Sequence, residues 1–204
     1  MGRLEFLAKM RVERITLTGE RIHLEPISIS HIDQLARVAS DLSIWEFAPE
    51  QINDREKMER YVEQALNDQA EGKSLPFVTK LTGSGEIVGS TRFGNIDPSN
   101  LKTEIGWTWI DPAWQRTFVN TEAKFLMLSH AFEVWRCIRV EFKTDATNVR
   151  SRDAILRLGA VQEGTLRQHM ITESGRFRDS VYFSILDKEW GGIKVRLQEM
   201  LRKQ

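Results

Sequence analysis

The stretch DPAWQRTFVNTEAK, residues 111–124, joins the end of a predicted strand to the start of a predicted helix. The strand covers residues 102–110, and the helix begins near Thr121 with an apolar stripe that must meet the sheet. Unpaired backbone N–H groups and a partial positive charge mark the N-terminus of such a helix. The connection is therefore suited to bind an anion such as a pyrophosphate without a metal.

Alternating and helical patterns of apolar residues continue on both sides of this stretch. Before it they predict a strand, two helices and an antiparallel hairpin, and after it a strand, a helix, a final hairpin and a C-terminal helix. This order predicts a mixed α+β domain, with a largely antiparallel sheet and one β-α-β-α unit, rather than a doubly wound parallel sheet. The predicted strands are residues 21–27, 75–81, 86–93, 102–110, 138–144, 161–171 and 176–186, and the predicted helices are residues 30–39, 53–70, 121–135, 148–158 and 190–201.

Length, amino-acid composition and net charge limit the class of protein. The chain has 204 residues, 41% of them hydrophobic and 28% charged, as in folded globular proteins. At this length we expect one domain, residues 10–204, with residues 1–9 an extension or a disordered N-terminus. Lys plus Arg and Asp plus Glu both number 29, so no net basic charge favours nonspecific binding of nucleic acid or an anionic membrane. The sequence predicts neither partner.

Further features set expectations about location and chemistry. No apolar run reaches the ~20 residues of a membrane span. Cys137 is the only cysteine, which suits a reducing compartment and favours the cytoplasm. The common nucleotide-loop, zinc-protease and serine-hydrolase motifs are absent, and the four histidines are scattered. We therefore expect no metal site, and either a monomer or a homodimer.

Four segments resemble the GNAT N-acetyltransferases, and most closely their RimJ/RimL-type branch. They are WQRT (114–117) in the loop, EIGW (104–107) in the strand before it, NVRS (148–151) at a helix start, and LGAVQEG (158–164). Order and spacing agree from about residue 18 to residue 186. The resemblance implies a single three-layer domain with the GNAT acyl-CoA N-acyltransferase fold, and acetyl-CoA as the co-substrate.

The loop differs from the wider family at two positions. Glycines that let the backbone turn toward phosphate in the family are replaced here by Phe118 and Asn120. Asn tolerates the left-handed region and is a good N-cap, whereas Phe118 requires a negative φ. The replacements bear on the affinity for CoA more than on the fold.

The resemblance also implies a set of cofactor-binding residues. The strand end at Trp109 and Ile110 would pair with the pantetheine amides through its backbone, and the loop would bind the pyrophosphate. Asn148 would cap the next helix and reach the cofactor, and Ser151 would protonate or hydrogen-bond the CoA sulfur. The cofactor-binding residues are therefore Trp109, Ile110, Gln115, Arg116, Thr117, Phe118, Val119, Asn120, Thr121, Asn148 and Ser151.

Two carboxylates are candidates for the base that deprotonates the acceptor. Glu104 is expected on the face opposite Trp107, which would share its own face with Ile105 and Trp109. Glu163, on a later strand, is the second candidate. Either could instead be a solvated or salt-bridged carboxylate of the sheet. With Ser151, these two residues are the candidate catalytic residues.

The sequence thus predicts an N-acetyltransferase in which an amine attacks acetyl-CoA directly. A protein N-terminal α-amine or a small-molecule amine is the favoured acceptor, because an α-amine titrates near 7.7–8.0 and a lysine near 10.4, so that only a weak base is needed. The alternative is a catalytically silent acyl-CoA-binding or regulatory module, suggested by Phe118 and by the lack of a decisive base. A third interpretation is an unrelated α+β interaction protein that binds no CoA.

Overall fold

The computed structural model describes residues 10–204, and the extension expected at residues 1–9 lies outside these residues. In the described part, eight strands form one sheet in the order β1-β2-β3-β4-β5-β6-β8-β7. All neighbours are antiparallel except β5 and β6, which are parallel. The strands are β1 (Leu17–Thr18), β2 (Ile22–Pro26), β3 (Leu75–Leu81), β4 (Ile87–Asp97), β5 (Lys102–Ile110), β6 (Arg139–Asp145), β7 (Val161–Ile171) and β8 (Phe177–Leu186).

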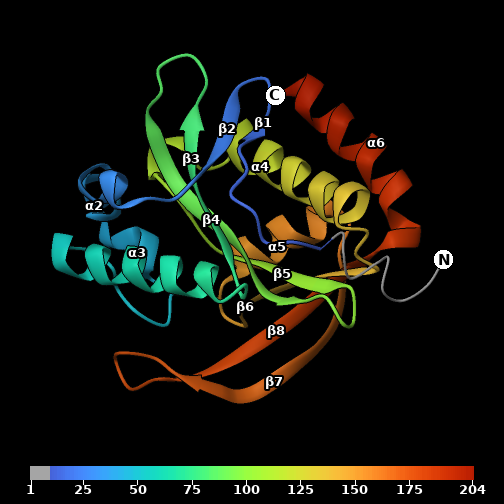
Figure 1. Ribbon diagram of the computed structural model, residues 1–204. Helices are drawn as coiled ribbons and strands as arrows, with labels where there is room; N and C mark the ends of the chain where they lie inside the picture. Colours follow the sequence, from blue (N-terminus) through green and yellow to red (C-terminus); the bar gives the residue numbers. More distant parts are fainter. Residues whose placement is uncertain (1–9) are drawn as a thin grey trace.

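Helices cover both faces of this sheet (Figure 1). On one face α2 and α3 pack against β4 and β3, and they enclose a core that includes Trp45 and Met58. On the other face α4, α5 and α6 share a larger core that includes Met127, Ile155 and Leu197. The helices are α2 (Ile32–Ala39), α3 (Arg55–Ala70), α4 (Phe118–Ser129), α5 (Val149–Leu158) and α6 (Asp187–Lys203), with short turns η1 (Ile29–His31), η2 (Leu42–Trp45), η3 (Pro112–Trp114) and η4 (His130–Val134, π-helical).

This arrangement confirms the predicted fold class, an α+β sandwich of three layers around a mostly antiparallel sheet. The parallel pair is formed by β5 and β6, with α4 as the crossover between them. Among residues 10–204, no helix combines the length and the apolar composition that crossing a bilayer requires.

The start of α4 differs from the sequence prediction. The helix begins at Phe118 rather than near Thr121, because Thr117 is the N-cap and its Oγ1 accepts a hydrogen bond from the N–H of Val119 at 3.3 Å. Asn120 therefore lies in the first turn and is not the cap. Neither Phe118 nor Asn120 has a positive φ. The left-handed residue of the loop is Arg116, with φ 62°.

The face assignments on β5 were also wrong in part: Trp107 and Trp109 share a face as predicted, but Ile105 does not share it and Glu104 does not lie opposite Trp107. Ile105 belongs to the core beneath α4, whereas Trp109 belongs to the core beneath α2 and α3. Trp107 shares the face of Glu104, because a Cβ on Gly94, which pairs with Glu104, would meet the Trp107 ring at 2.3 Å. The physical reason is an extra residue in β5, which reverses the alternation of side chains.

Candidate active site

The sheet opens between β5 and β6. Their parallel pairing covers three residues of each strand and ends at Glu104 opposite Glu141. β6 stays paired with β8 as far as Asp145, while β5 continues to Ile110 against β4 alone. The edge of β5 that faces β6 therefore has no strand partner from Gly106 onward. We call this opening the gap; it corresponds to the splayed strand end that the family resemblance implies.

A β-bulge lies on β5 beside the gap. Gly106 is opposite Arg92 and Trp109 is opposite Ser90, so three steps along β5 match two steps along β4. Trp107 takes up the extra residue with φ 50°, a conformation that is rare for a bulky side chain. Bulges and left-handed non-glycine residues concentrate at functional sites, where they redirect the backbone.

The loop into α4 is fastened to the end of β5. The Nε2 of Gln115 donates to the carbonyl of Ile110 at 3.0 Å, and the Oγ1 of Thr117 donates to the carbonyl of Trp114 at 2.7 Å. The first N–H groups of a helix have no intrahelical acceptor. That of Val119 is satisfied by Thr117, which leaves the neighbouring first-turn N–H groups free for an anion.

Three side chains around this first turn are packed against the rest of the protein. The Phe118 ring packs under the Arg21 guanidinium, 4.1 Å from its carbon, and edge-on to Trp114. Val119 and Thr121 are completely buried, so their side chains are not placed to contact a ligand. Phe118 thus fits the loop without a strained φ, because its backbone is helical.

The start of α5 lies beside the start of α4. Asn148 caps α5 through its Oδ1, which accepts a hydrogen bond from the N–H of Ser151 at 2.9 Å. Arg150, in the same turn, donates from Nη1 to the Oε1 of Gln115 at 3.4 Å and so links the two helix starts. Neither first turn contains Asp or Glu. The positive ends of both helix dipoles are therefore uncompensated, which fits the phosphates of CoA.

Glu104 stands where the gap begins. It is 3% exposed, and its Oε2 accepts a hydrogen bond from the Nδ2 of Asn95 at 2.8 Å and lies 3.6 Å from the Nζ of Lys143. A Cβ on Gly106 would lie 3.2 Å from Oε1, so the carboxylate extends along β5 toward the bulge. Asn95 has φ 47° at a second bulge, in β4. The sequence did not reveal these partners, because only the strand register brings them to Glu104.

Glu163 has a different environment. Arg139 Nη1 donates to its Oε1 at 2.7 Å, Nη2 contacts Oε2, and the Oγ of Ser184 donates to Oε1 at 2.7 Å. The hydrogen bonds from Arg139 lower the pKa of Glu163 to about 2. Its contacts are those of a salt-bridged carboxylate on the outer strand β7, and a pKa this low makes it a poor proton acceptor.

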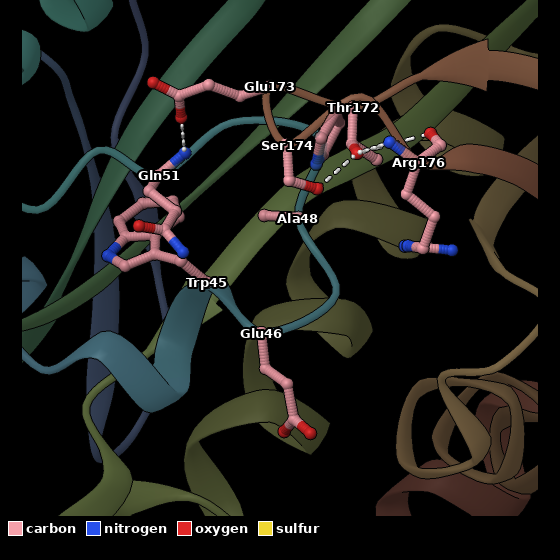
Figure 2. A pocket seen from close by; sticks show the side chains of 9 residues that line it. Trp45, Glu46, Ala48, Gln51, Thr172, Glu173, Ser174 and Arg176 are labelled. Atoms are coloured by element: carbon pink, nitrogen blue, oxygen red, sulfur yellow. Dashed lines mark hydrogen bonds between the residues drawn. The ribbon is translucent and has the colours of Figure 1, made fainter.

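A pocket of about 240 Å³ lies between the segment 45–51 and the β7–β8 turn (Figure 2). Trp45 on its wall packs against Trp109 of β5, with ring centroids 5.6 Å apart. Glu46 lies 3.6 Å from an arginine in the first turn of α5, and Arg176 hydrogen-bonds to Asp145 at the end of β6. The lining of the pocket thus contacts all three elements around the gap.

Glu173 closes one side of this pocket by tying the β7–β8 turn to the loop after η2. Its Oε2 accepts from the N–H of Gln51 at 2.9 Å, the bond drawn in Figure 2, and its N–H donates to the carbonyl of Pro49 at 2.7 Å. Its Oε1 accepts from the Nζ of Lys57 at 2.8 Å. Two segments that are far apart in the sequence therefore form one rim.

Other parts of the described chain are weaker candidates for a functional site. A pocket of about 610 Å³ between the β1–β2 turn, α4 and α6 contains none of the predicted site residues. Within residues 10–204, no three His, Cys, Asp or Glu side chains are grouped to hold a metal ion. Burial raises the pKa of the Cys137 thiol to about 12, which makes it a poor nucleophile.

Comparison with known proteins agrees with this geometry. Residues 21–161 match the family described as the acetyltransferase (GNAT) domain. YdaF of Bacillus subtilis is 33% identical over 110 residues, which are 54% of this chain and 59% of YdaF. The ribosomal-protein-serine acetyltransferase of Escherichia coli is 27% identical over 104 residues, 51% of this chain and 58% of that protein. The chain thus spans about three fifths of the length of these two curated relatives.

Among solved structures, a GCN5-related N-acetyltransferase from Brucella melitensis superposes with a TM-score of 0.85. It is 32% identical, over 93% of this chain and 86% of that chain. The family match covers more than half of the chain and includes β5, the loop, α4 and α5. By sequence and by structure, this chain belongs to the GNAT acetyltransferase family.

Proposed function

We propose that this protein is an N-acetyltransferase that moves the acetyl group of acetyl-CoA to a primary amine by direct attack. The observation that carries the proposal is the gap, where a free strand edge, two uncompensated helix N-termini and a buried carboxylate meet. The favoured acceptor is a protein N-terminal α-amine, with a small-molecule amine as the other member of the class.

The residues on the α4 and α5 side would hold the co-substrate. Backbone groups of Trp109 and Ile110 would pair with the pantetheine, and the segment 115–121 would bind the pyrophosphate through its N–H groups. The first turn of α5, with Asn148 and Ser151, would lie along the thioester. When bound, acetyl-CoA supplies an activated acetyl group, so no covalent enzyme intermediate is needed.

The proton chemistry falls to two side chains. Glu104 would accept the proton that the amine loses as the C–N bond forms and the C–S bond breaks. Because Glu104 is 3% exposed, we expect it to act through a water molecule in the gap rather than by direct contact. Ser151 would donate a hydrogen bond to the departing sulfur. Glu163, neutralised by Arg139, is left with a structural role.

The acceptor would enter through the pocket between Trp45 and Arg176, which opens on the opposite side of the gap from α4. Glu46 on its lining supplies an exposed carboxylate that would attract an ammonium group. The name of the Escherichia coli relative assigns a ribosomal protein as the acceptor of that protein, which supports a protein acceptor here. We also propose a cytoplasmic location, because the lone cysteine is a free thiol.

The test is an assay of free thiol release from acetyl-CoA with a peptide that has a free N-terminus. The same peptide with a blocked N-terminus and a free lysine is the matched control, and a small amine is a third acceptor. We expect release with the free N-terminus, less with lysine, and no change in excess EDTA. Ser151→Ala should lower kcat and leave the Kd for CoA nearly unchanged.

Calorimetry with CoA separates the alternatives. Binding of CoA without amine-dependent thiol release from any acceptor would identify the silent acyl-CoA-binding module. Absence of CoA binding would overturn the proposal altogether.

A further inference from the structure

Lys124 has a buried amine that takes no part in the chemistry proposed above. It lies on α4 and is 6% exposed. No carboxylate among residues 10–204 lies within ion-pair distance of its Nζ. Burial alone lowers its pKa to about 7. A lysine in such a place destabilises the fold relative to an apolar residue of similar size, so its position calls for a compensating role.

The contacts of Lys124 lead to the β5 bulge. Its Nζ donates to the Oγ1 of Thr108 at 2.7 Å and to the Oγ1 of Thr91 at 3.2 Å. The two hydroxyls are 2.8 Å apart, and both lie within hydrogen-bond distance of the carbonyl of Gly106, at 3.3 Å for Thr108 and 3.4 Å for Thr91. Gly106 is the residue before the bulge. The carbonyl of Gly106 beside the bulge is therefore within reach of two hydroxyl donors that Lys124 contacts.

The opposite face of the bulge is held in another way. The Trp107 ring fills the space above Gly94 and lies 5.4 Å from the Arg92 guanidinium. Packing thus fixes Trp107 on the face of α2 and α3, while Lys124 and two hydroxyls fix Thr108 on the face of α4. Trp107, at φ 50°, stays in its left-handed conformation only if the surroundings impose it.

We propose that Lys124 is a positioning residue that holds the bulge of β5, so that the free edge of the strand has the shape that binds acetyl-CoA. The inference rests on the proposed function, because the gap is taken as the acetyl-CoA site. Lys124 acts through Thr108 and touches no substrate. Its hydrogen bonds maintain the shape of β5. An apolar side chain at this position would make the fold more stable but could not form them.

The experiment compares Lys124→Met with the wild-type protein. We expect an unchanged or higher Tm, because the buried amine is removed, together with an approximately tenfold rise in the Kd for CoA and in the KM for acetyl-CoA. The KM for the acceptor should stay within about twofold. A lysine that only stabilised the fold would instead lower the Tm and leave the Kd for CoA unchanged.

Three threonine variants keep the inference falsifiable if Lys124→Met does not fold. Thr108→Val should raise the Kd for CoA as Lys124→Met does, and Thr108→Ser, which keeps the hydroxyl, should behave as wild type. Thr79→Val, which removes a buried hydroxyl from β3 away from the gap, is the matched control and should leave the Kd unchanged. The double variant Lys124→Met/Thr108→Val should bind CoA no more weakly than the weaker single variant.

Wild-type affinity in Lys124→Met or in Thr108→Val overturns the inference and leaves the proposed function intact. Loss of affinity in Thr79→Val of the same size as in Thr108→Val also overturns it. Failure of the wild-type protein to bind CoA would overturn the proposed function, and this inference with it.

Discussion

The two flanks of β6 differ in their strand pairing and in the partners of their carboxylates. On one flank β6 pairs with β8 along its whole length, and the nearby carboxylate Glu163 is neutralised by Arg139. On the other flank the pairing with β5 ends at Glu104, whose partners are an amide and a lysine 3.6 Å away. We call these the closed flank and the open flank. Strand pairing is complete on the first flank, whereas on the second the edge of β5 beyond Glu104 is left free.

The helix N-termini follow the same division. Asp33 lies in the first turn of α2, Glu56 in that of α3, and Asp187 with Glu189 in that of α6. These carboxylates compensate the helix dipoles, as is usual for structural helices. The first turns of α4 and α5, which meet at the open flank through Arg150 and Gln115, have none. Uncompensated charge, and not only geometry, therefore marks the site.

The largest effect should come from exchanging the two carboxylates for amides. Glu104→Gln should lower kcat by about 10²–10⁴-fold, the usual contribution of general acid–base assistance, and leave the Kd for CoA nearly unchanged. Glu163→Gln, the matched control, should stay within about threefold, because its carboxylate is already neutralised. Steady-state kinetics on both variants provide the comparison. Equal losses of kcat would erase the distinction between the flanks.

The pH profile sharpens this prediction. Raising the pH supplies neutral amine from solution, so Glu104→Gln should recover part of its rate between pH 6 and 9, and more with an α-amine than with lysine. Wild-type activity of Glu104→Gln at pH 6, where neutral amine is scarcest, would show that Glu104 is not the base.

A smaller effect is expected when a carboxylate is placed in a helix first turn at the open flank, as in α2, α3 and α6. Asn120→Asp places a carboxylate in the first turn of α4, which stabilises the helix by a few tenths of a kcal/mol and repels a bound pyrophosphate. The Kd for CoA should rise about tenfold at low salt and less at 0.5 M salt, where charges are screened. Asn120→Ser is the neutral control. If both variants bind CoA equally, the helix dipole does not contribute to the anion site.

Most of the fold could be predicted from the sequence, because the apolar residues of each helix and strand recur with the period of that element. The strands Leu75–Leu81, Lys102–Ile110 and Val161–Ile171 lie where the alternation predicted them. The bulge at Trp107 could not be predicted, since the apolar pattern of residues 102–110 gives no sign of an extra residue, which shows only in the pairing with β4. The assignment of Ile105 to the face of Trp107 and Trp109 failed for that reason.

The candidate site was accessible only in part. Asn148 as the cap of α5 follows from local rules, and the structure has it. The partners of Glu104, Asn95 and Lys143, come from other strands and depend on register. The burial of Lys124 could have been predicted from the sequence. It stands three and four residues before the buried Met127 and Leu128, and therefore lies on the inward stripe of α4. What it contacts there could not be inferred without the sheet.

The smallest effect concerns the stability of the closed flank. Arg139 holds the pKa of Glu163 at about 2 in the folded protein, below the ordinary value of 4.5. A carboxylate with a lowered pKa stabilises the fold above pH 4.5, and that contribution is lost as the pH falls toward 2. Glu163→Gln should therefore be less stable than wild type at pH 7, and the difference should shrink between pH 5 and 3. Urea unfolding at both ends of that range measures it.

The size of this difference is limited by solvent and by a second partner. The side chain of Glu163 is 41% exposed, so water screens the pair and we expect about 1 kcal/mol or less at pH 7. Arg139 also has Glu141 as a partner, because the Nε of Arg139 donates to the Oε1 of Glu141 at 2.7 Å. The substitution of Glu163 therefore leaves no isolated buried cation. Ser184→Ala, which removes only the hydroxyl donor to Glu163, should show a smaller dependence on pH. A difference of several kcal/mol that does not change with pH would mean that Glu163 stabilises the flank by packing, and that charge pairing is not what distinguishes it from Glu104.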